Sequence, residues 1–435
     1  MGVIADLHIH SRFSRACSNQ LTVQNLEKWA RVKGINLLGT GDFTHPLWNK
    51  ELHQELTDDG SGILRTSGGF RFIPTTEVAN IYSYGGKGRR VHNVMLAPSL
   101  DVVDRINAAL LKIGRLDYDG RPIFGLSCER LVEMMRAIDE RIEIIPAHAW
   151  TPWFGVFGSE SGFDSLRDAF VSQEKNVHAI ETGMSSDPAM NWRISELNSR
   201  SIVSFSDAHS FWPWRLGREA TIFRKADSYE DIINAIRRRD IEATIETDPA
   251  YGKYHWDGHR NCGFSSPPEG SRQLKGLCPK CGRPLIIGVE NRVEKITNQS
   301  EGNYPDRRPY NKVLQLSELI AAVSGSPVAS RKMWAAYTPL VEKFGNEFRV
   351  LLDADEAELT RALQNDSALV STILENREGK IKVKPGYDGV YGVAVIGGRE
   401  VALEGEGDKT KAASTEKPKV RPGAKQKGLT DFGAV

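Results

Sequence analysis

The sequence predicts an α/β protein whose first part, residues 1–247, folds as βα units around a parallel sheet or barrel. Apolar runs rich in Val and Ile alternate with helical patterns there. A His, Asp or Glu lies in or just after nearly every run, and the carboxyl ends of barrel strands meet at one face. We therefore expect these polar side chains to converge. The runs are VIADLHIH, INLLGTGD, FRFIPTTE, RVHNVMLA, IEIIPAHA, VHAIETG and SIVSFSDAH.

The composition is that of a globular chain with two or more domains. Of the 435 residues, 40% are hydrophobic and 26% are charged, and no apolar run approaches the ~20 residues of a membrane span. The start, MGVIADLHIH, has neither the basic nor the apolar region of a signal peptide, which favours a cytoplasmic location without membrane contact. The net charge of +1 neither demands nor excludes nucleic acid, because phosphates respond to local basic patches.

Three further segments follow the first. Residues 248–295 contain glycines, prolines and clustered cysteines, which indicates a small zinc-binding module. Residues 296–403 return to helical periodicity and end in KIKVKPGYDGVYG, so a mainly helical domain ending in a hairpin is expected. Residues 404–435 carry many charges and few large apolar side chains, which predicts a disordered tail.

The segment DLHIH brings two histidines onto one face of a strand. Because side chains alternate along a strand, His8 and His10 project side by side with Asp6 behind them. Two neutral imidazoles suit a divalent transition metal such as zinc or manganese. A single His is more often a hydrogen-bonded structural residue, but the pair at this spacing favours a metal site.

Further candidate metal ligands follow the later runs. A carboxylate such as Glu77 can bridge two cations, and such a pair would favour hydrolysis of a phosphate ester. Each residue alone is compatible with a helix cap or a satisfied core polar group, but this interpretation is implausible for the whole set. The set of candidate catalytic and metal-binding residues is His8, His10, Asp42, Glu77, His92, His148, Asp207 and His209.

The ordered series DLHIH, TGD, TTE, RVH, PAH and SDAH resembles the polymerase and histidinol phosphatase (PHP) superfamily. This resemblance implies a distorted (β/α)7 barrel that holds two or three divalent ions (Zn, Mn or Mg). The sequence departs from the family pattern at two places. Asp42 stands where a His is commoner, and the loop SRFSRACSN lacks the further His that often follows DLHIH in the family. The implied ligand sets are His8, His10, Glu77 and Asp207 for one ion, Glu77, His92 and His148 for a second, and Asp42 and His209 for a third.

A second cluster of metal-binding residue types lies in the module at residues 248–295. His259, Cys262, Cys278 and Cys281 form an H-x2-C…C-x2-C arrangement that matches the ligand spacing of a closed, tetrahedral structural zinc site. The alternative is a group of reduced cysteines without a metal. His255 is a possible substitute for His259 as the fourth ligand.

The whole arrangement resembles the endonuclease Q family more specifically than it resembles other PHP proteins. The resemblance rests on LGTGDFTHP, PAHAWTPW, SDAHS followed by RLGRE, and the cysteine pairs, and it covers about nine tenths of the chain. It implies a DNA repair enzyme that cuts the strand on the 5′ side of deaminated bases such as hypoxanthine and uracil, and of abasic sites. The implied partner is damaged DNA, double-stranded or single-stranded.

Aromatic, small polar and basic residues near the metal motifs are candidates for substrate contacts. Enzymes that read a damaged base generally hold it against aromatic or apolar walls. Core packing is the competing interpretation for the rings, and a solvated surface is the competing one for the arginines. The candidates are Trp150, Trp153, Gly183, Ser185, Ser186, Phe211, Trp212, Arg215 and Arg218.

The last residues, QKGLTDFGAV, resemble the peptide that docks on archaeal and eukaryotic sliding clamps. Gln426, Leu429 and Phe432 have the required spacing, although Gly433 stands where a second aromatic residue normally follows. A short anchor on a disordered tether is a known recognition mode, and a chance match is the alternative.

These observations predict a metal-dependent endonuclease that leaves a 3′ hydroxyl and a 5′ phosphate. A PHP phosphomonoesterase acting on a small metabolite is one alternative, which the zinc module and the helical domain disfavour. A non-catalytic adaptor for DNA or a clamp is the other, and the nearly complete ligand set disfavours it.

Overall fold

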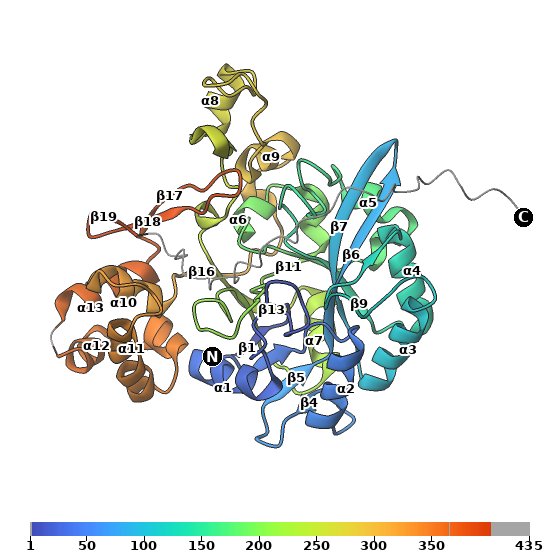
Figure 1. Cartoon of the computed structure of the whole chain (residues 1–435), viewed down its shortest axis with the longest axis horizontal. Helices are drawn as coiled ribbons and strands as arrows, with labels where there is room; N and C mark the ends of the chain where they lie inside the picture. Colours follow the sequence, from blue (N-terminus) through green and yellow to red (C-terminus); the bar gives the residue numbers. More distant parts are fainter. Residues whose placement is uncertain (1, 365, 402–435) are drawn as a thin grey trace, which may run out of the picture. The chain divides into compact units, whose positions relative to one another are not determined.

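The computed structural model describes residues 2–364 and 366–401 of the chain (Figure 1). The predicted tail at 404–435, with the clamp-binding candidates Gln426, Leu429 and Phe432, therefore lies outside the described residues. Within the described part, no helix combines the length and the apolar character needed to cross a membrane.

Strands from the first part of the chain follow one another around a ring in sequence order. They are β1 (Val3–Asp6), β2 (Leu37–Gly39), β5 (Arg71–Ile73), β7 (Lys87–Leu96), β9 (Glu143–Pro146), β10 (Ala179–Glu181) and β11 (Ser201–Val203). Parallel pairs join β1 to β2, β2 to β5, and β10 to β11. Ala149, after β9, donates its N–H to the carbonyl of Glu181 in β10 at 2.9 Å. The ring closes where Ala208, after β11, bridges Ile9.

The expectation of parallel strands throughout residues 1–247 is wrong for β7. The run FRFIPTTE is divided at Pro74 into β5 and β6 (Thr75–Tyr84), and β6 forms a long antiparallel hairpin with β7. Gly85 and Gly86 turn this hairpin with φ of +60° and +73°, a conformation that a tight two-residue loop demands and glycine adopts without strain. Because the hairpin reverses the chain, β7 also pairs antiparallel with β9.

Additional strands extend the arrangement beyond the ring. β12 (Ala220–Phe223) pairs antiparallel with β1, and β13 (Ile241–Glu246) pairs antiparallel with β12. β16 (Tyr310–Lys312) adds in parallel to β13, while β4 (Leu64–Arg65) and β3 (Thr57–Asp58) extend the side of β5. These strands complete an eight-stranded sheet, and β8 (Ile123–Phe124) joins β6 in another. Residues 310–312, from the predicted helical domain, thus belong to the same sheet as β1.

Helices cover the ring of strands, and their ends carry the expected capping residues. Thr22 caps α1 at its start and Gly34 ends it with φ of +99°. Ser228 and Asp231 form a capping box at the start of α7. The helices are α1 (Val23–Lys33), α2 (Pro46–Glu55), α3 (Leu100–Leu110), α4 (Cys128–Ile138), α5 (Leu166–Phe170), α6 (Pro188–Asn191) and α7 (Tyr229–Arg238).

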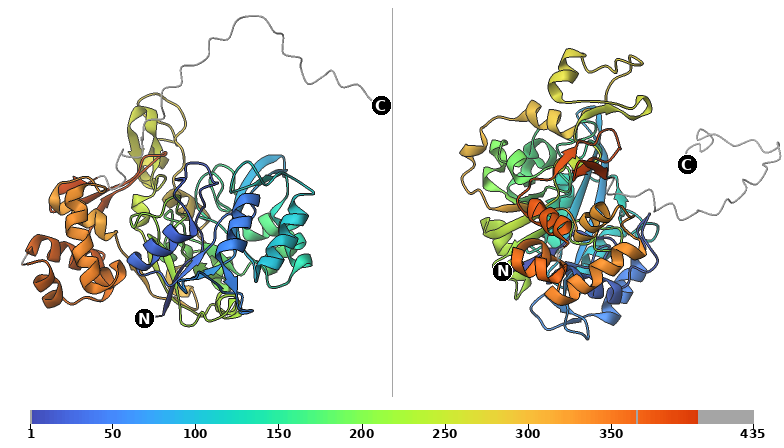
Figure 2. Two further views of the ribbon diagram at one scale, coloured as in Figure 1. Left: turned by 60° about the horizontal axis from the view of Figure 1, so that its bottom comes forward. Right: turned by 90° about the vertical axis from the view of Figure 1, so that its left-hand side faces the viewer.

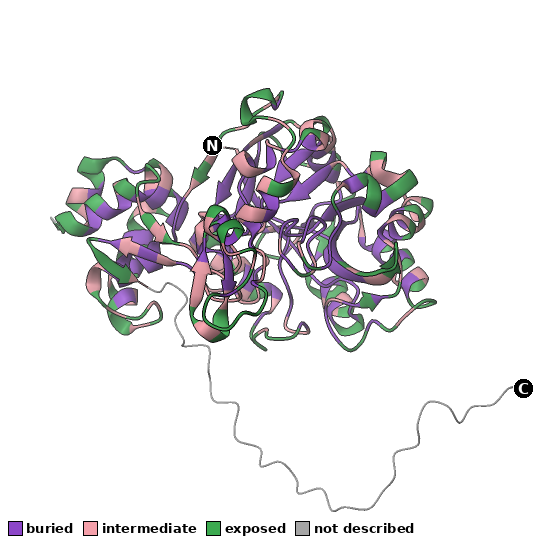
Figure 3. Ribbon diagram, turned by 90° about the horizontal axis from the view of Figure 1, so that it is seen from above, coloured by how far each residue is buried: buried purple, intermediate pink, exposed green. Residues whose placement is uncertain are grey.

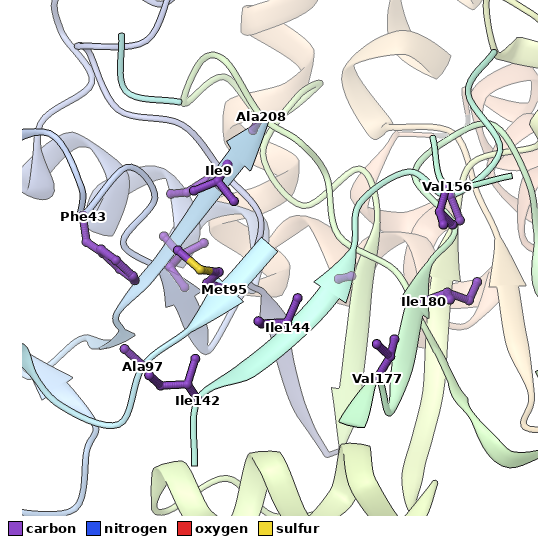
Figure 4. Packing of buried hydrophobic residues seen from close by; sticks show 14 of the residues in the cluster. Ile9, Phe43, Met95, Ala97, Ile142, Ile144, Val156, Val177, Ile180 and Ala208 are labelled. Carbon is purple, nitrogen blue, oxygen red and sulfur yellow. The ribbon is translucent and has the colours of Figure 1, made fainter. Parts of the chain in front are cut away.

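The core of this part lies along the strands. Ile9, Met95, Ile144 and Ile180 are buried in one continuous apolar cluster (Figure 4). Burial is concentrated on the strands, whereas exposed residues lie mainly on helices and loops (Figure 3). This packing keeps the strand ends in place, so the side chains that follow the strands are held by a rigid framework.

The cysteine-containing module and the helical segment follow. The module has β14 (Asp257–His259), β15 (Phe264–Ser266), α8 (Pro268–Gln273) and α9 (Val289–Ile296). The helices α10 (Leu316–Ser324), α11 (Arg331–Phe344), α12 (Glu356–Ala362) and α13 (Ser367–Arg377) pack around a second apolar cluster (Figures 1 and 2). The predicted hairpin is confirmed as β17 (Lys382–Lys384) and β18 (Val393–Ile396), to which β19 (Arg399–Val401) adds.

Candidate active site

Four predicted residues meet where the ring strands end. His10 Nε2 lies 3.2 Å from Glu77 Oε2 and 3.0 Å from Asp207 Oδ1. His8 Nε2 lies 3.6 Å from each of the same two carboxylates. Ligand atoms of His8, His10, Glu77 and Asp207 all fall within 4.8 Å of one another, so one cation could contact them together.

A second group shares Glu77 with the first. The other oxygen of this carboxylate, Oε1, lies 2.7 Å from His92 Nδ1 and 3.2 Å from His148 Nε2. The two imidazoles approach to 3.2 Å. Glu77 therefore presents one oxygen to each group, which is the arrangement that a bridging carboxylate between two cations requires.

Buried carboxylates outside the two groups orient the histidines. Glu181 contacts His8 Nδ1 at 2.9 Å and accepts the backbone N–H of His148 at 2.6 Å. Asp42 contacts His10 Nδ1 at 2.9 Å. Such partners fix the tautomer and aim the opposite nitrogen at a metal. Indeed His8 Nε2 is buried without a hydrogen-bond partner in the structure, which fits a free lone pair for a cation.

The prediction that Asp42 and His209 hold a third ion stays a prediction, and the two side chains have the following surroundings. Asp42 is fully buried, and its Oδ2 accepts hydrogen bonds from Ser11 and Ser14 in addition to the contact with His10. His209 Nδ1 lies 3.0 Å from the carbonyl oxygen of Asp207. Among the described residues, neither belongs to a group of three or more metal-capable side chains. The contact of Asp42 with His10 Nδ1 helps to orient that imidazole.

Several site residues have strained backbones. Asp42, His148 and Asp207 have φ of +46°, +33° and +49°, in the left-handed region that such residues seldom adopt. Gly183 allows the chain to pass close to this site, because a Cβ there would lie 2.5 Å from the Cβ of His148. Strain of this kind persists only where the surroundings enforce it and is concentrated at functional sites.

The electrostatics match a cation-binding cluster. Burial opposes ionisation of Glu77, but His92 and Arg121 hold the pKa of its carboxyl well below the usual range. Burial lowers the pKa of His92 to about 4, although the carboxylate of Glu77 acts in the opposite direction. Burial also opposes protonation of His8, but neighbouring carboxylates, led by Glu181, raise its pKa well above the ordinary value. The excess of negative charge is what a bound cation would neutralise.

Two residues of the site were missed by the sequence interpretation. Glu181 follows the run VHAI in the same way as the other ligands follow their runs, so the signal for it was present. Arg121, whose Nη1 lies 2.8 Å from Glu77 Oε2, comes from an irregular loop that shows no periodicity. Asp6, predicted to lie behind the histidines, accepts hydrogen bonds from Ser206 and Gly217 and so anchors the loop that contains Asp207.

The structure places several of the predicted substrate-binding residues in the core. Trp150 is fully buried, and its Nε1 donates to Asn191 Oδ1 at 2.7 Å. Phe211 is buried against the ring of Trp29. Ser186 is also fully buried, with its hydroxyl 3.2 Å from the carbonyl of Thr182. Tight packing of these side chains leaves no face for a substrate.

The remaining candidates differ in exposure. Ser185 is buried, whereas Trp153 is 39% exposed. Trp212 is half-buried and stacks on Trp214 with ring centres 5.3 Å apart. Arg215 and Arg218 lie in the chain segment that follows Asp207. Arg218 Nε donates to the carbonyl of Ser206 at 3.1 Å.

The second predicted metal cluster comes together in the module that contains β14 and β15. Ligand atoms of His259, Cys262, Cys278 and Cys281 lie within 4.8 Å of one another. Gly282 donates its N–H to the carbonyl of Cys278 at 2.8 Å, in the tight turn typical of a zinc knuckle. His255, the alternative ligand, lies beside Glu290 and is outside the group.

This chain is similar to known proteins over different parts of its length. The family described as the MJ0043 C-terminal domain matches residues 315–380. The MJ0043 protein of Methanocaldococcus jannaschii is 32% identical over 295 residues, which are 66% of this chain and 35% of that protein. This chain thus spans about a third of that relative's length. The YqxK protein of Bacillus subtilis is 27% identical over 412 residues, 90% of this chain and 98% of that protein.

Two crystal structures are similar over nearly the whole chain. The lesion-specific endonuclease PfuEndoQ of Pyrococcus furiosus is 32% identical, with a TM-score of 0.81, and the match covers 91% of this chain and 95% of that one. Endonuclease Q in complex with a 27-mer duplex that has an abasic lesion at the active site is 32% identical, with a TM-score of 0.80 and coverage of 90% and 96%. The chain has the same mixed α/β fold, and it belongs to the endonuclease Q family.

Proposed function

We propose that this protein is a metal-dependent DNA repair endonuclease. It hydrolyses the phosphodiester bond on the 5′ side of hypoxanthine, uracil and abasic sites, and leaves a 3′ hydroxyl and a 5′ phosphate. The observation that carries the proposal is the pair of ligand groups that share Glu77, one oxygen to each. The similarity to endonuclease Q, one structure of which holds an abasic duplex, supports DNA as the substrate.

The roles of the site residues follow from their positions. His8, His10, Glu77 and Asp207 would hold one cation, and Glu77, His92 and His148 a second. Divalent cations bound there supply Lewis acidity and lower the pKa of water, which is the chemistry that displacement at a phosphodiester needs. Glu181 and Asp42 hold His8 and His10 in the ligating tautomer. The guanidinium of Arg121 supplies a positive charge beside Glu77, where a phosphate would bind.

The domain organisation belongs to the same proposal. Residues 1–247 would form the PHP-type barrel, 248–295 the zinc-binding module and 296–403 the mainly helical domain. One zinc ion would be held by His259 and the three cysteines of its group. The residues that would contact the DNA are Trp153, Trp212, Arg215 and Arg218.

The test is an incubation of purified protein with labelled duplexes that carry one deoxyinosine, one deoxyuridine, one abasic site or no lesion. Manganese, magnesium or zinc is added, with a chelator as control. A metal-dependent nick on the 5′ side of the lesion supports the proposal. Equal cutting of undamaged DNA refutes lesion specificity, and hydrolysis of a small phosphomonoester without any nick favours the metabolite phosphatase.

Glu181→Gln is expected to lower the nicking rate about 10- to 100-fold, mainly through weaker metal binding. The amide keeps the shape of the carboxyl group but removes the negative charge that supports His8 and the backbone of His148. Nicking is measured as a function of manganese concentration, and added metal should rescue part of the loss. Glu143→Gln is the matched control, because Glu143 is a buried carboxylate that contacts His178 away from the site. An unchanged metal dependence in Glu181→Gln would contradict its proposed role.

Cys281→Ser is expected to remove about one zinc ion per chain, because a serine hydroxyl is a poor replacement for a thiolate in a closed zinc site. Metal content is measured by mass spectrometry of the purified protein. Cys17→Ser is the control, since Cys17 lies outside the metal-capable groups of the described residues. Equal zinc content in Cys281→Ser and the unaltered protein would exclude Cys281 as a ligand.

A further inference from the structure

A turn next to the metal-capable groups presents aromatic side chains at the surface. It follows His148 directly and contains Trp153, which is 39% exposed although it is a large apolar residue. Arg90, from the hairpin of β6 and β7, places its guanidinium carbon 5.7 Å from the ring centre of Trp153 and 5.9 Å from that of Phe154. Trp150 already anchors this turn in the core. Core packing therefore does not explain why the rings of Trp153 and Phe154 follow it.

Phe154 connects this surface to the site. Its ring centre lies 4.3 Å from that of His92, and its carbonyl accepts the backbone N–H of His92 at 2.9 Å. Its backbone has a φ of +71°, which is unfavourable for an aromatic residue, and its N–H donates to Ser161 Oγ at 3.2 Å. The half-buried ring is thus held at the edge of the second ligand group by contacts that outweigh backbone strain.

We propose that Arg90, Trp153 and Phe154 form a stacking subsite for an unpaired nucleotide beside the scissile phosphate. This inference rests on the proposed function, because it assigns the DNA strand to the same site. Aromatic faces stack on any base without reading its sequence, and an arginine beside them can pair with the phosphate of the same nucleotide. The charge of Arg90 complements the polyanion, and Phe154 contacts a ligand of the group that contains Glu77. The occupant is therefore a nucleotide rather than an apolar protein segment.

The direct test uses 2-aminopurine, a base whose fluorescence is quenched by stacking. It is placed next to an abasic site in a duplex, and binding is followed with full-length protein in a Glu77→Gln background to prevent cutting. Trp153→Ala and Phe154→Asn are each expected to reduce the quenching and to weaken binding about 5- to 100-fold. Asparagine is chosen at residue 154 because it tolerates positive φ, so that the ring is lost without added backbone strain.

Matched variants separate stacking from general surface effects. Trp153→Phe and Phe154→Tyr should retain most of the quenching, and Arg90→Gln should weaken binding with a smaller salt dependence. Leu111→Ala and Arg130→Gln, at exposed positions on other elements, should behave like the unaltered protein. In protein that keeps Glu77, Trp153→Ala and Phe154→Asn could still nick lesion DNA at the normal rate. If they did, and if the same substitutions kept full quenching in the Glu77→Gln background, the subsite would be overturned and the endonuclease function would remain intact. If the unaltered protein does not nick at all, the proposed function fails, while ring-dependent quenching would still support a nucleotide-stacking surface.

Discussion

Glu77→Gln is expected to lower the rate of lesion-dependent nicking by about 10³-fold or more. Glu77 is the residue whose two oxygens face the two ligand groups, 3.2 Å from His10 Nε2 and 2.7 Å from His92 Nδ1. Replacement by an amide removes the charge that both groups share, so both cations would bind more weakly. Single-turnover nicking of an abasic duplex and metal content by mass spectrometry are the measurements.

The control for this variant is a carboxylate that takes no part in the site. Glu133, exposed on α4 and paired with Arg130, is suitable, and Glu133→Gln should nick at the normal rate. If Glu77→Gln retained more than about a tenth of the activity with full metal content, the shared-ligand role would be wrong. Loss of nicking with a retained ability to bind lesion DNA would separate the enzyme from a non-catalytic adaptor.

Lys33→Met is expected to reduce the free energy of unfolding by about 3–5 kcal/mol, because it leaves a buried carboxylate without its cation. Lys33 is fully buried, and its Nζ lies 2.8 Å from Glu347 Oε1 and 2.7 Å from the carbonyl of Pro213. Gln315 also accepts a hydrogen bond from this ammonium group. The ion pair thus joins α1 of the first part of the chain to the helical segment and to the loop that follows His209.

A second variant isolates the ion pair from simple loss of packing. In Lys33→Met with Glu347→Gln, the amide oxygen can still accept the Leu316 N–H, which contacts Glu347 Oε1 at 3.0 Å. The amide NH2 then takes the place of Oε2, 2.6 Å from Tyr337 Oη, where it can donate to the tyrosine hydroxyl oxygen. The double variant should therefore be more stable than Lys33→Met alone, although it carries one more substitution. Chemical denaturation followed by circular dichroism gives the free energies. A loss below about 1 kcal/mol in Lys33→Met would show that the ammonium group contributes little.

The metal-capable residues of the site could be predicted because their signal is local. His8, His10, Glu77 and Asp207 are polar residues within or directly after apolar runs, and strand ends meet wherever such runs form a sheet. The four residues of the zinc-type cluster have a spacing that few other structures require. Both sets come together in the structure, and each consists of predicted residues alone.

The substrate-contact residues could not be predicted in the same way. Trp150 and Trp153 are three positions apart in one loop, yet one is fully buried and the other is 39% exposed. Both are tryptophans in the same loop, so the sequence has no signal that separates them. Only the surrounding packing distinguishes the core ring from the surface ring. Arg121 likewise reaches Glu77 from a loop whose path is determined by contacts distant in sequence.

The sequence by itself determined the α/β fold class, the residues of both metal-capable clusters and the presence of the hairpin of β17 and β18, because these depend on periodicity and short spacing. Tertiary structure alone decided the direction of β7, since an apolar run has no polarity of its own and the hairpin from β6 sets it. It also decided which side chains surround Asp42, because the contacts of this carboxylate with His10 and Ser11 depend on how the chain folds around it.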